Sequence, residues 1–557
     1  MRVNRHILPI IALLTISVAV RFVPLLYSTL PFNIDGFPLV RISEDIIETG
    51  HWQISYPENT SAFVTYNSKL PVISLLISTF ALVFGRTPLE IAQVIMPLIS
   101  CCAIVIIYAA AYKITKNELV SFFAGLALAL NGFYVYLGAA VMKETVGLVL
   151  LILCLYLYLN REDPRKRILA GMLLLLIALT HHLTTWIAFI MVTLFVLTSN
   201  ALQWQDGTFQ KKRLIIDILS GPFLFVFVIL YYESVKLSFF NQVSSINDVA
   251  LFASVFLLGM LICISFSIPK KRKKPRNIIF NKPLIIPVVG LAFIVLNHYK
   301  TVFPGTIRTS TPFLIYLIPY LLLCSIALIG INVVGAKKTE HKPFIAAIIV
   351  APFLVILFAF LKGFDAFTFI LIYRSYDYID FGLAICAGIG AGYLIKTIVK
   401  ILIRKDNTSK TSFGLKATLS IVFLAICLST VPLAYQGQEF YGVQDATYSY
   451  EFTAMNWLSE NGAESHVSTD ERLNDIMAPY FDLECDKTLP WKLKYSRSLE
   501  RGSMLFMEEK WLREGAQMSP MEPILISKDT FNNTLERNNV IYNTGGTESD
   551  VHIVIVR

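Results

Sequence analysis

The chain has 557 residues, of which 55% are hydrophobic and only 16% are charged. This balance leaves too little polar surface for a soluble globular protein and indicates an integral membrane protein. The net charge of +9 is uneven: from Tyr435 onward there are 11 Lys and Arg against 20 Asp and Glu, and before it 37 against 19. The basic residues lie in short runs between apolar segments, a pattern that sets membrane topology, so we assign no nucleic-acid partner.

Apolar runs of about 20 residues, the length of a helix that spans a bilayer, recur along the chain. They begin near Ile7, Ile91, Val120, Thr145, Ile168, Thr184, Leu214, Val249, Pro283, Pro312, Pro343, Tyr378 and Ala417. A single helix over residues 168–200 would be roughly 50 Å long, so two spans that meet at His181-His182 fit better. We therefore expect an all-α polytopic membrane domain over residues 1–434 with about thirteen transmembrane helices.

The connections between these runs indicate the orientation in the membrane. Basic clusters fall on every second connection, at residues 161–167, 211–213, 270–276, 337–342 and 404–416, together with the basic N-terminus. The excess of Lys and Arg marks the cytoplasmic side. We expect an integral plasma (cell) membrane protein with a cytoplasmic N-terminus, a large first external loop at 31–70 and an extracytoplasmic C-terminal part.

The tail, residues 435–557, has the pattern of a small soluble domain. A helical pattern over residues 450–459 is followed by short apolar runs at 523–527 and 551–556, which predict an α/β domain. Upstream, the glycines at 388, 390 and 392 fall inside an expected span. Small residues at that spacing permit close helix packing, and we prefer that interpretation to a nucleotide-binding loop.

Asp35 is the first candidate for chemistry, because it follows directly after the first apolar helix in an acid-rich external loop. Partial desolvation beside a bilayer would raise its basicity and let it accept a proton from a hydroxyl group. The alternative is a solvated loop residue that caps the next helix. The spacing alone slightly favours this alternative.

Three further polar residues fall on the same expected side of the membrane. Glu144 sits where an apolar helix begins, so it either complements the helix dipole or positions an acceptor or a divalent ion. His181 and His182 form a polar notch in an apolar stretch. They either contact a sugar or phosphate or mark a break between two helices.

Several motifs resemble known families. The pattern Asp-Gly-x4-Arg-x2-Glu-x-Ile-x2-Thr-Gly over residues 35–50 is similar to the first external loop of the catalytic subunit of oligosaccharyltransferases. The segments 66–71 and 84–90 are similar to the Lys-Pro-Pro segment and its sequel in protein O-mannosyltransferases and lipid A aminoarabinose transferases. These families belong to the GT-C superfamily of membrane glycosyltransferases. The resemblance covers most of the chain in layout, but only short motifs in sequence.

The resemblance extends to Met142–Thr145, where those families carry a second acid, and to Tyr373–Tyr378, where oligosaccharyltransferases place an arginine that contacts a lipid-linked phosphate. The helix before their Trp-Trp-Asp-Tyr-Gly motif looks like residues 454–462 here. At the expected place of that motif the chain has Ser468-Thr469-Asp470-Glu471-Arg472. Because the motif reads the acceptor sequence, transfer of a whole glycan to asparagine is not expected.

The resemblance implies a sugar on a polyprenyl phosphate that is displaced at C1 by a protein, lipid or glycan acceptor. Such a reaction needs a base and a phosphate clamp. Our expected catalytic residues are Asp35 and Glu144; the expected phosphate ligands are Arg374 first, then Lys69 and Arg308, since arginine offers two donors in a fixed fork. Arg41, His181, His182 and Tyr373 are expected to contact substrate. For each cation the alternative is interfacial anchoring.

A metal cofactor and a second function class remain open. Asp35, Glu144 and Asp45 could supply the oxygen ligands of a divalent Mg or Mn ion, but the third acid motif of oligosaccharyltransferases is missing, so we assign none. The alternative class is a transporter or flippase for a lipid-linked or polar solute, which also carries rare charges among many helices. Transporters usually place such charges at mid-membrane in repeated halves, and duplicated halves are not evident in this sequence.

Overall fold

The computed structural model describes residues 6–58, 60–237, 245–268, 285–301, 308–336, 339–363, 365–402, 409–435, 446–462, 466–518, 523–545 and 550–557. In the first part of the chain the elements are α1 (Ile7–Arg21), η1 (Val23–Leu26), α2 (Gly36–Thr49), α3 (Ala62–Ser68), α4 (Val72–Phe84), α5 (Pro88–Thr115), α6 (Glu118–Leu130), α7 (Gly132–Ala139), α8 (Lys143–Leu159), α9 (Pro164–Ala178) and α10 (His182–Gln205). They continue with α11 (Lys211–Leu219), α12 (Leu224–Ser234), α14 (Ile246–Ser267), α15 (Ile285–Tyr299), α16 (Thr311–Ala336), α17 (Lys342–Lys362), α18 (Ala366–Tyr376), α19 (Ile379–Leu402), α20 (Ser409–Leu428) and η3 (Val431–Tyr435).

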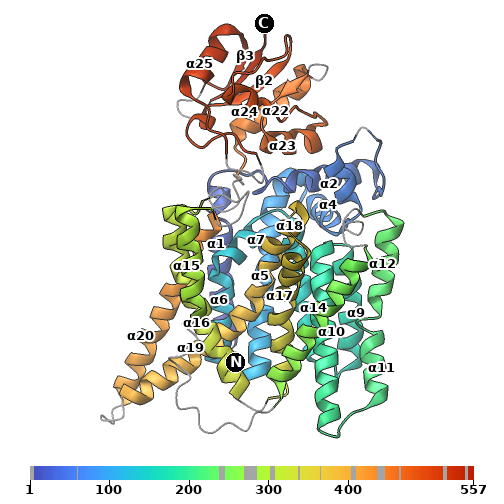
Figure 1. The fold of residues 1–557 in the computed structure, drawn as a ribbon, viewed down its shortest axis with the longest axis vertical. Coiled ribbons are helices and arrows are strands. Elements are labelled where there is room, and N and C mark those ends of the chain that lie inside the picture. Colours follow the sequence, from blue (N-terminus) through green and yellow to red (C-terminus); the bar gives the residue numbers. More distant parts are fainter. Residues whose placement is uncertain are drawn as a thin grey trace.

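The helices form one bundle, and the C-terminal part lies over one end of it (Figure 1). The N-terminus lies toward the other end of the bundle. Among the described residues, eight helices are long and apolar enough to cross a membrane, or up to ten if each bent helix pair is one span. This agrees with a polytopic membrane protein, at fewer spans than the thirteen expected. One reason is that helices such as α8 and α9 have only 17 and 15 residues.

Two breaks in the bundle are made by polar side chains that cap the following helix. The carbonyl oxygen of the Asn131 side chain accepts from the Phe133 N–H at 3.1 Å and starts α7. His181 stands before α10, and its ring accepts from the Thr184 N–H. Each cap satisfies a backbone donor that the helix cannot pair. The break at His181 matches the expected meeting point of two helices.

The glycines of α19 bring three helices into close contact. A Cβ atom on Gly388 would lie 2.6 Å from the Ala124 N of α6. One on Gly390 would overlap the Ile326 carbonyl oxygen of α16, and one on Gly330 of α16 would overlap the Cys386 carbonyl oxygen. Only glycine allows the backbones to approach this closely. The glycine run of α19 therefore permits close helix packing.

The C-terminal part combines a small sheet with short helices. Its elements are α22 (Ser449–Asn461), β1 (Val467–Ser468), α23 (Glu471–Phe481), α24 (Leu489–Lys494), β2 (Met504–Glu508), η4 (Glu509–Leu512), α25 (Lys528–Arg537), β3 (Asn539–Asn543) and β4 (Val551–Ile555). The strand order is β1-β2-β4-β3. The β1–β2 pair is parallel, with Val467 opposite Met504, while β4 runs antiparallel to β2 and to β3. This is the α/β fold expected for the tail.

Helix α2 of the first loop packs against the C-terminal part. Leu30 and Phe37 are buried in the same apolar cluster as residues of α22, α23 and the sheet. Tyr480 donates to Glu44 Oε1 at 3.0 Å, and burial raises the pKa of Glu44. These contacts tie the acid-rich loop to the C-terminal part.

Candidate active site

The beginning of α2 is held against the loop before α8. The Val141 N–H donates to the Phe32 carbonyl oxygen at 3.0 Å, which joins the two segments through their backbones. A Cβ on Gly36 would lie 2.7 Å from Pro31 Cβ and 3.0 Å from Val141 Cβ, so glycine is needed for this approach. The Asp-Gly pair of the motif therefore combines a carboxylate with the small residue that positions it.

Asp35 occupies the N-cap position of α2, yet its side chain makes no capping hydrogen bond. Its Oδ2 lies 3.5 Å from Arg374 Nη2. The local turn is set by Asn33, which has a φ of 92° and whose side chain accepts from the Asp35 N–H at 2.9 Å. The Asp35 side chain is 42% exposed, so it is less desolvated than expected. It is nevertheless aimed at a cation instead of its own helix.

Arg374, in the last turn of α18, bridges the two carboxylates that the sequence singled out. Its Nη1 donates to Glu144 Oε1 at 2.6 Å, a short charge-assisted bond. Its 3.5 Å separation from Asp35 is longer than such a bond. The arginine is thus held firmly on one side and loosely on the other.

Glu144 stands in the first turn of α8, where a negative charge also complements the helix dipole. Its side chain is 7% exposed. Besides Arg374, Glu144 Oε1 lies 3.4 Å from His181 Nε2, and His181 Nδ1 is 2.8 Å from Thr184 Oγ1. Glu144 is therefore buried beneath Arg374 and anchored from both sides.

A second cation, Lys143, was not among the residues singled out from the sequence. Its Nζ lies 4.2 Å from the centroid of the Tyr66 ring, and the Tyr66 hydroxyl is 2.6 Å from His182 Nδ1. Lys143 interacts electrostatically with Glu144, Asp35 and Arg374. The sequence did offer a signal for Lys143, because it directly precedes Glu144, which was already a candidate.

The remaining candidates are distributed as follows. The Tyr373 hydroxyl accepts from Arg374 Nε at 3.3 Å, which places it in the cluster. Lys69 Nζ donates to the Lys236 carbonyl oxygen at 3.2 Å, and Arg41 ion-pairs with Asp482 at 3.4 Å. Arg308 is exposed just before α16, and within the described ranges no contact joins it to the cluster.

The cluster lies at an end of the bundle. Arg374 falls among the first eight residues of the 36-residue apolar stretch Phe367–Leu402, which is about 54 Å long at 1.5 Å per residue. A hydrocarbon core is about 30 Å thick, so the ends of this stretch extend beyond it. In Figure 1, α18 and α2 lie at the end that faces the C-terminal part.

The arrangement fits a metal ion poorly. Arg374 lies within 3.5 Å of two of the three carboxylates considered as ligands, Asp35 and Glu144, and its positive charge would repel a metal ion bound there. The third, Asp45, contacts Arg41 and Tyr56 instead. Within the described ranges, the group of acidic and histidine side chains with suitable spacing is Glu509, Asp550 and His552, in the C-terminal part. That the site has no assigned metal stays a prediction.

Two solved structures align with nearly the whole chain. ArnT from Cupriavidus metallidurans, bound to undecaprenyl phosphate, shares 13% identity at a TM-score of 0.41, over 98% of this chain and 97% of ArnT. The arabinofuranosyltransferase AftD from mycobacteria shares 11% identity at a TM-score of 0.48; the match covers 98% of this chain but spans only 40% of AftD. No protein-family model and no curated protein matches the chain. At these values the alignments assign no residue or reaction, so function is argued from the side chains.

Proposed function

We propose that the protein is a GT-C-type membrane glycosyltransferase that moves a sugar from a polyprenyl-phosphate donor to a protein, lipid or glycan acceptor. The observation that carries the proposal is the Asp35–Arg374–Glu144 cluster, with separations of 3.5 and 2.6 Å. A solvent-accessible carboxylate beside a held arginine, at the end of apolar helices, provides a base and a phosphate clamp in one place.

The chemistry follows from the two unequal contacts of Arg374. The donor phosphate replaces the long Asp35 contact, while Glu144 keeps the guanidinium in place. Asp35 then accepts the proton of the acceptor hydroxyl as that oxygen bonds to C1 of the sugar. The bond between C1 and the phosphate oxygen breaks, and Arg374 and Lys143 stabilise the negative charge of the departing polyprenyl phosphate.

In this proposal Glu144 is a positioning residue. Its side chain is 7% exposed and lies beneath Arg374, so it is poorly placed to contact an acceptor. His181 supports it from the other side at 3.4 Å. The positions of the three charged residues also speak against a transporter, because each lies beside a helix end, whereas transported solutes bind near mid-membrane.

The orientation in the membrane belongs to the same proposal. The cytoplasmic N-terminus expected from the basic clusters and its position away from the C-terminal part in Figure 1 support an outer-face reaction. Cysteine labelling with an impermeant reagent in intact cells tests it. A cysteine introduced at the exposed Glu484 is expected to react, and one at the exposed Asp206 is not.

The deciding experiment compares membranes that carry wild type, Asp35→Asn or Asp206→Asn at equal expression. Labelled sugar on a mixed polyprenyl-phosphate pool is the donor, and endogenous material is the acceptor. Asp206 is exposed at the end of α10, so its variant is the matched control. We expect transfer by wild type and Asp206→Asn and a loss of at least 100-fold with Asp35→Asn. Equal transfer by all three would overturn the role of Asp35, and uptake of label without transfer would favour transport.

A further inference from the structure

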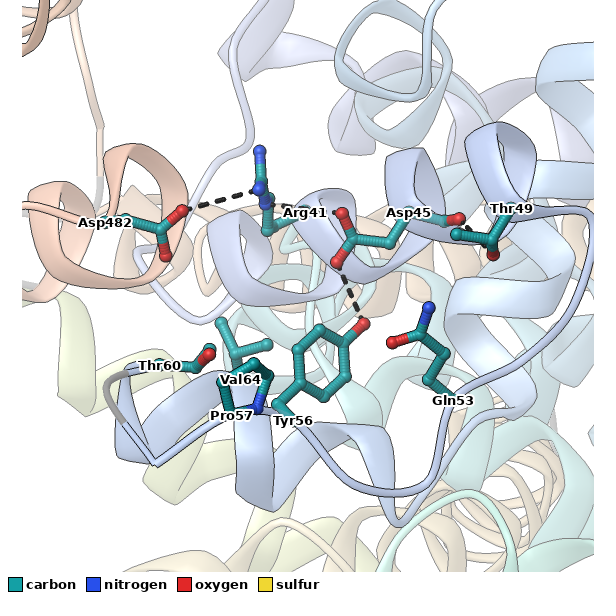
Figure 2. A pocket seen from close by; sticks show the side chains of 9 residues that line it. All are labelled: Arg41, Asp45, Thr49, Gln53, Tyr56, Pro57, Thr60, Val64 and Asp482. Carbon is teal, nitrogen blue, oxygen red and sulfur yellow. Dashed lines mark hydrogen bonds and ion pairs between the residues drawn. The ribbon is translucent and has the colours of Figure 1, made fainter.

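A polar cavity lies between the first loop and Asp482 of the C-terminal part, and its lining includes none of the residues of the Arg374 cluster. Its volume is about 210 Å³, below the roughly 300–1,000 Å³ of pockets that hold drug-sized ligands. Figure 2 shows Arg41 between the carboxylates of Asp45 and Asp482, with the Tyr56 hydroxyl pointing at Asp45 from the other wall. The size suits a single ring or a small polar group.

The charge of the lining excludes an anionic ligand. Two carboxylates and one guanidinium line the cavity, which gives a net charge of about −1. Arg41 is already paired with Asp45 at 3.5 Å and Asp482 at 3.4 Å, so no free cation faces the space among its lining residues. A phosphate or carboxylate would meet repulsion, and a neutral or cationic group is favoured.

The cavity is lined partly by polar groups and partly by apolar side chains. Donors and acceptors come from Arg41, Asp45, Gln53 and the Tyr56 hydroxyl, which donates to Asp45 Oδ2 at 2.9 Å. The Tyr56 ring, Pro57 and Val64 supply apolar contact. A pyranose ring has the same division, with hydroxyl groups around its edge and C–H groups on its face, and an aromatic ring can pack against that face.

The position of the cavity connects it to the proposed reaction. Arg41 and Asp45 lie six and ten residues after Asp35 on the same helix, α2, so roughly 9 and 15 Å along its axis. Asp482 comes from the end of α23, where it adopts a left-handed conformation with a φ of 54°. A ring bound here therefore touches both parts of the molecule within a few sugar lengths of the base.

From these observations we infer that the cavity binds one neutral or amino sugar ring of the acceptor, two or three units away from the hydroxyl that Asp35 activates. That the ring belongs to the acceptor rests on the proposed function. That the cavity binds a sugar ring does not. It narrows the acceptor class to a glycan or glycolipid. The C-terminal part then contributes directly to acceptor binding through Asp482.

Binding can be measured without turnover. The full chain carrying Asp35→Asn, in lipid nanodiscs, is titrated with the methyl pyranosides of glucose, galactose, mannose, N-acetylglucosamine and glucosamine, using saturation-transfer NMR. Tyr56→Phe keeps the ring and removes the hydroxyl, and Gln53→Ala removes an amide. Gln210→Ala, at an exposed position before α11, is the matched control. Trilysine is the competing peptide probe.

We expect at least one pyranoside to bind, binding at least tenfold weaker in Tyr56→Phe and in Gln53→Ala, and no change in Gln210→Ala. Absence of binding by every pyranoside, or binding unaffected by both cavity variants, would overturn the inference even where wild type transfers sugar. Displacement of the pyranoside by trilysine would also overturn it and assign the cavity to a cationic peptide. Sugar binding in a chain whose wild type shows no transfer would uphold the cavity and refute the proposed function.

Discussion

Glu144, Arg374 and Asp35 form a gradient of exposure, with 7%, 21% and 42% of their side chains accessible. The inner carboxylate makes the short bond to the arginine and the outer one makes the long contact. A substrate phosphate arriving from outside would therefore exchange with Asp35 first. The buried Glu144 therefore holds Arg374 in place, and the exposed Asp35 is the one that can act on the acceptor.

Substitution of Glu144 tests this separation. Glu144→Gln keeps the shape but removes the charge that holds Arg374, so we expect the KM for the lipid-linked donor to rise about 10-fold or more with a smaller change in kcat. Asp35→Asn is expected to lower kcat instead. Initial rates against donor concentration, in detergent, distinguish the two.

The control for this pair is Glu484→Gln, since Glu484 is exposed in the C-terminal part. It should leave both constants unchanged. A fall in kcat with Glu144→Gln at unchanged KM would contradict a positioning role and would make Glu144 a direct participant in the chemistry.

The C-terminal part also holds a buried group of charged side chains, which includes Arg472 at the start of α23. Arg472 Nη2 donates to Glu451 Oε2 at 2.8 Å, and Lys510 bonds to Glu451 and lies 3.0 Å from Glu508. Burial opposes ionisation of Glu451, but Arg472 and Lys510 hold its pKa at about 2. Burial raises the pKa of Glu508 to about 8. These residues are nearly inaccessible and hold the C-terminal part together.

The raised pKa of Glu508 gives stability a pH dependence. Because the folded-state pKa of about 8 lies above the ordinary value of 4.5, the stabilisation is complete below pH 4.5 and is lost as the pH rises through 8. Glu508→Gln cannot ionise, so we expect the variant to exceed wild type in stability at pH 9, by on the order of 2 kcal/mol. Hydrogen exchange of β2 amides in the full chain at pH 5 and 9, corrected for intrinsic rates, measures this. A larger stability difference at pH 5 than at pH 9 would contradict it.

The residues of the cluster could be anticipated only where the chemistry coincides with a local pattern. Asp35 and Arg374 stand out because charges directly beside apolar helices are rare and costly. Lys69 and Arg308 stand out for the same reason, but Lys69 follows the end of α3 and Arg308 precedes α16. Outside a helix the residue spacing does not fix the direction in which a side chain points. Lys143 was missed because its partner Tyr66 is distant in sequence.

At the scale of elements, the entry into α2 determines where Asp35 lies. Gly36→Ala would place a methyl group 2.7 Å from Pro31 Cβ and 3.0 Å from Val141 Cβ, which forces the helix start away from the loop before α8. A displacement of about 1 Å at a reacting group can cost about 100-fold in rate. We expect kcat to fall at least 10-fold while the yield of folded protein stays near wild type.

The comparison for Gly36→Ala is Gly414→Ala in α20, where an added Cβ meets nothing within 4 Å. Its activity should equal that of wild type. Wild-type kcat in Gly36→Ala would show that the two loops adjust freely and that their close approach does not position the base.

Close packing of α19 gives a prediction about stability. Gly390→Ala places a Cβ in the Ile326 carbonyl oxygen of α16, so we expect a lower melting temperature and a cost of about 1–3 kcal/mol or more. Gly414→Ala is expected to raise stability slightly, because alanine is the better helix residue. Thermal unfolding of both variants in the same detergent measures the change in melting temperature, which should be negative for Gly390→Ala and slightly positive for Gly414→Ala. A stabilised Gly390→Ala would refute the close contact of α16 and α19.

Hydrophobic periodicity predicted the class of most elements but not their number. Long runs such as those of α5, α16 and α17 are apolar throughout and can only be read as membrane spans. The number of spans is harder to predict for α3–α4 and α6–α7, because the two helices of each pair bend by 87° and 61° at short breaks. A bend depends on side-chain caps such as Asn131, whose amide also donates to Asp380 at 2.7 Å, a partner 249 residues away.

At the scale of the whole molecule, the loop that carries Asp35 is also part of the C-terminal core. Phe37 is fully buried, and its ring lies 6.1 Å from that of Phe452 and 6.0 Å from that of Tyr480 between centroids. Phe37 follows Asp35 by only two positions, with Gly36 between them. The C-terminal part and the site are therefore mechanically connected through the first turn of α2.

Phe37→Ala should loosen that connection. Removal of a buried Phe side chain costs about 3–5 kcal/mol, so we expect hydrogen exchange in α23 to rise by about 100-fold or more and transfer to fall, because α2 loses its support. Phe413→Ala, at a side chain 77% exposed in α20, is the control and should change neither. If α23 exchanges faster while transfer stays at the wild-type rate, the C-terminal part does not support the site. If both readouts stay unchanged, Phe37 does not hold the two parts together.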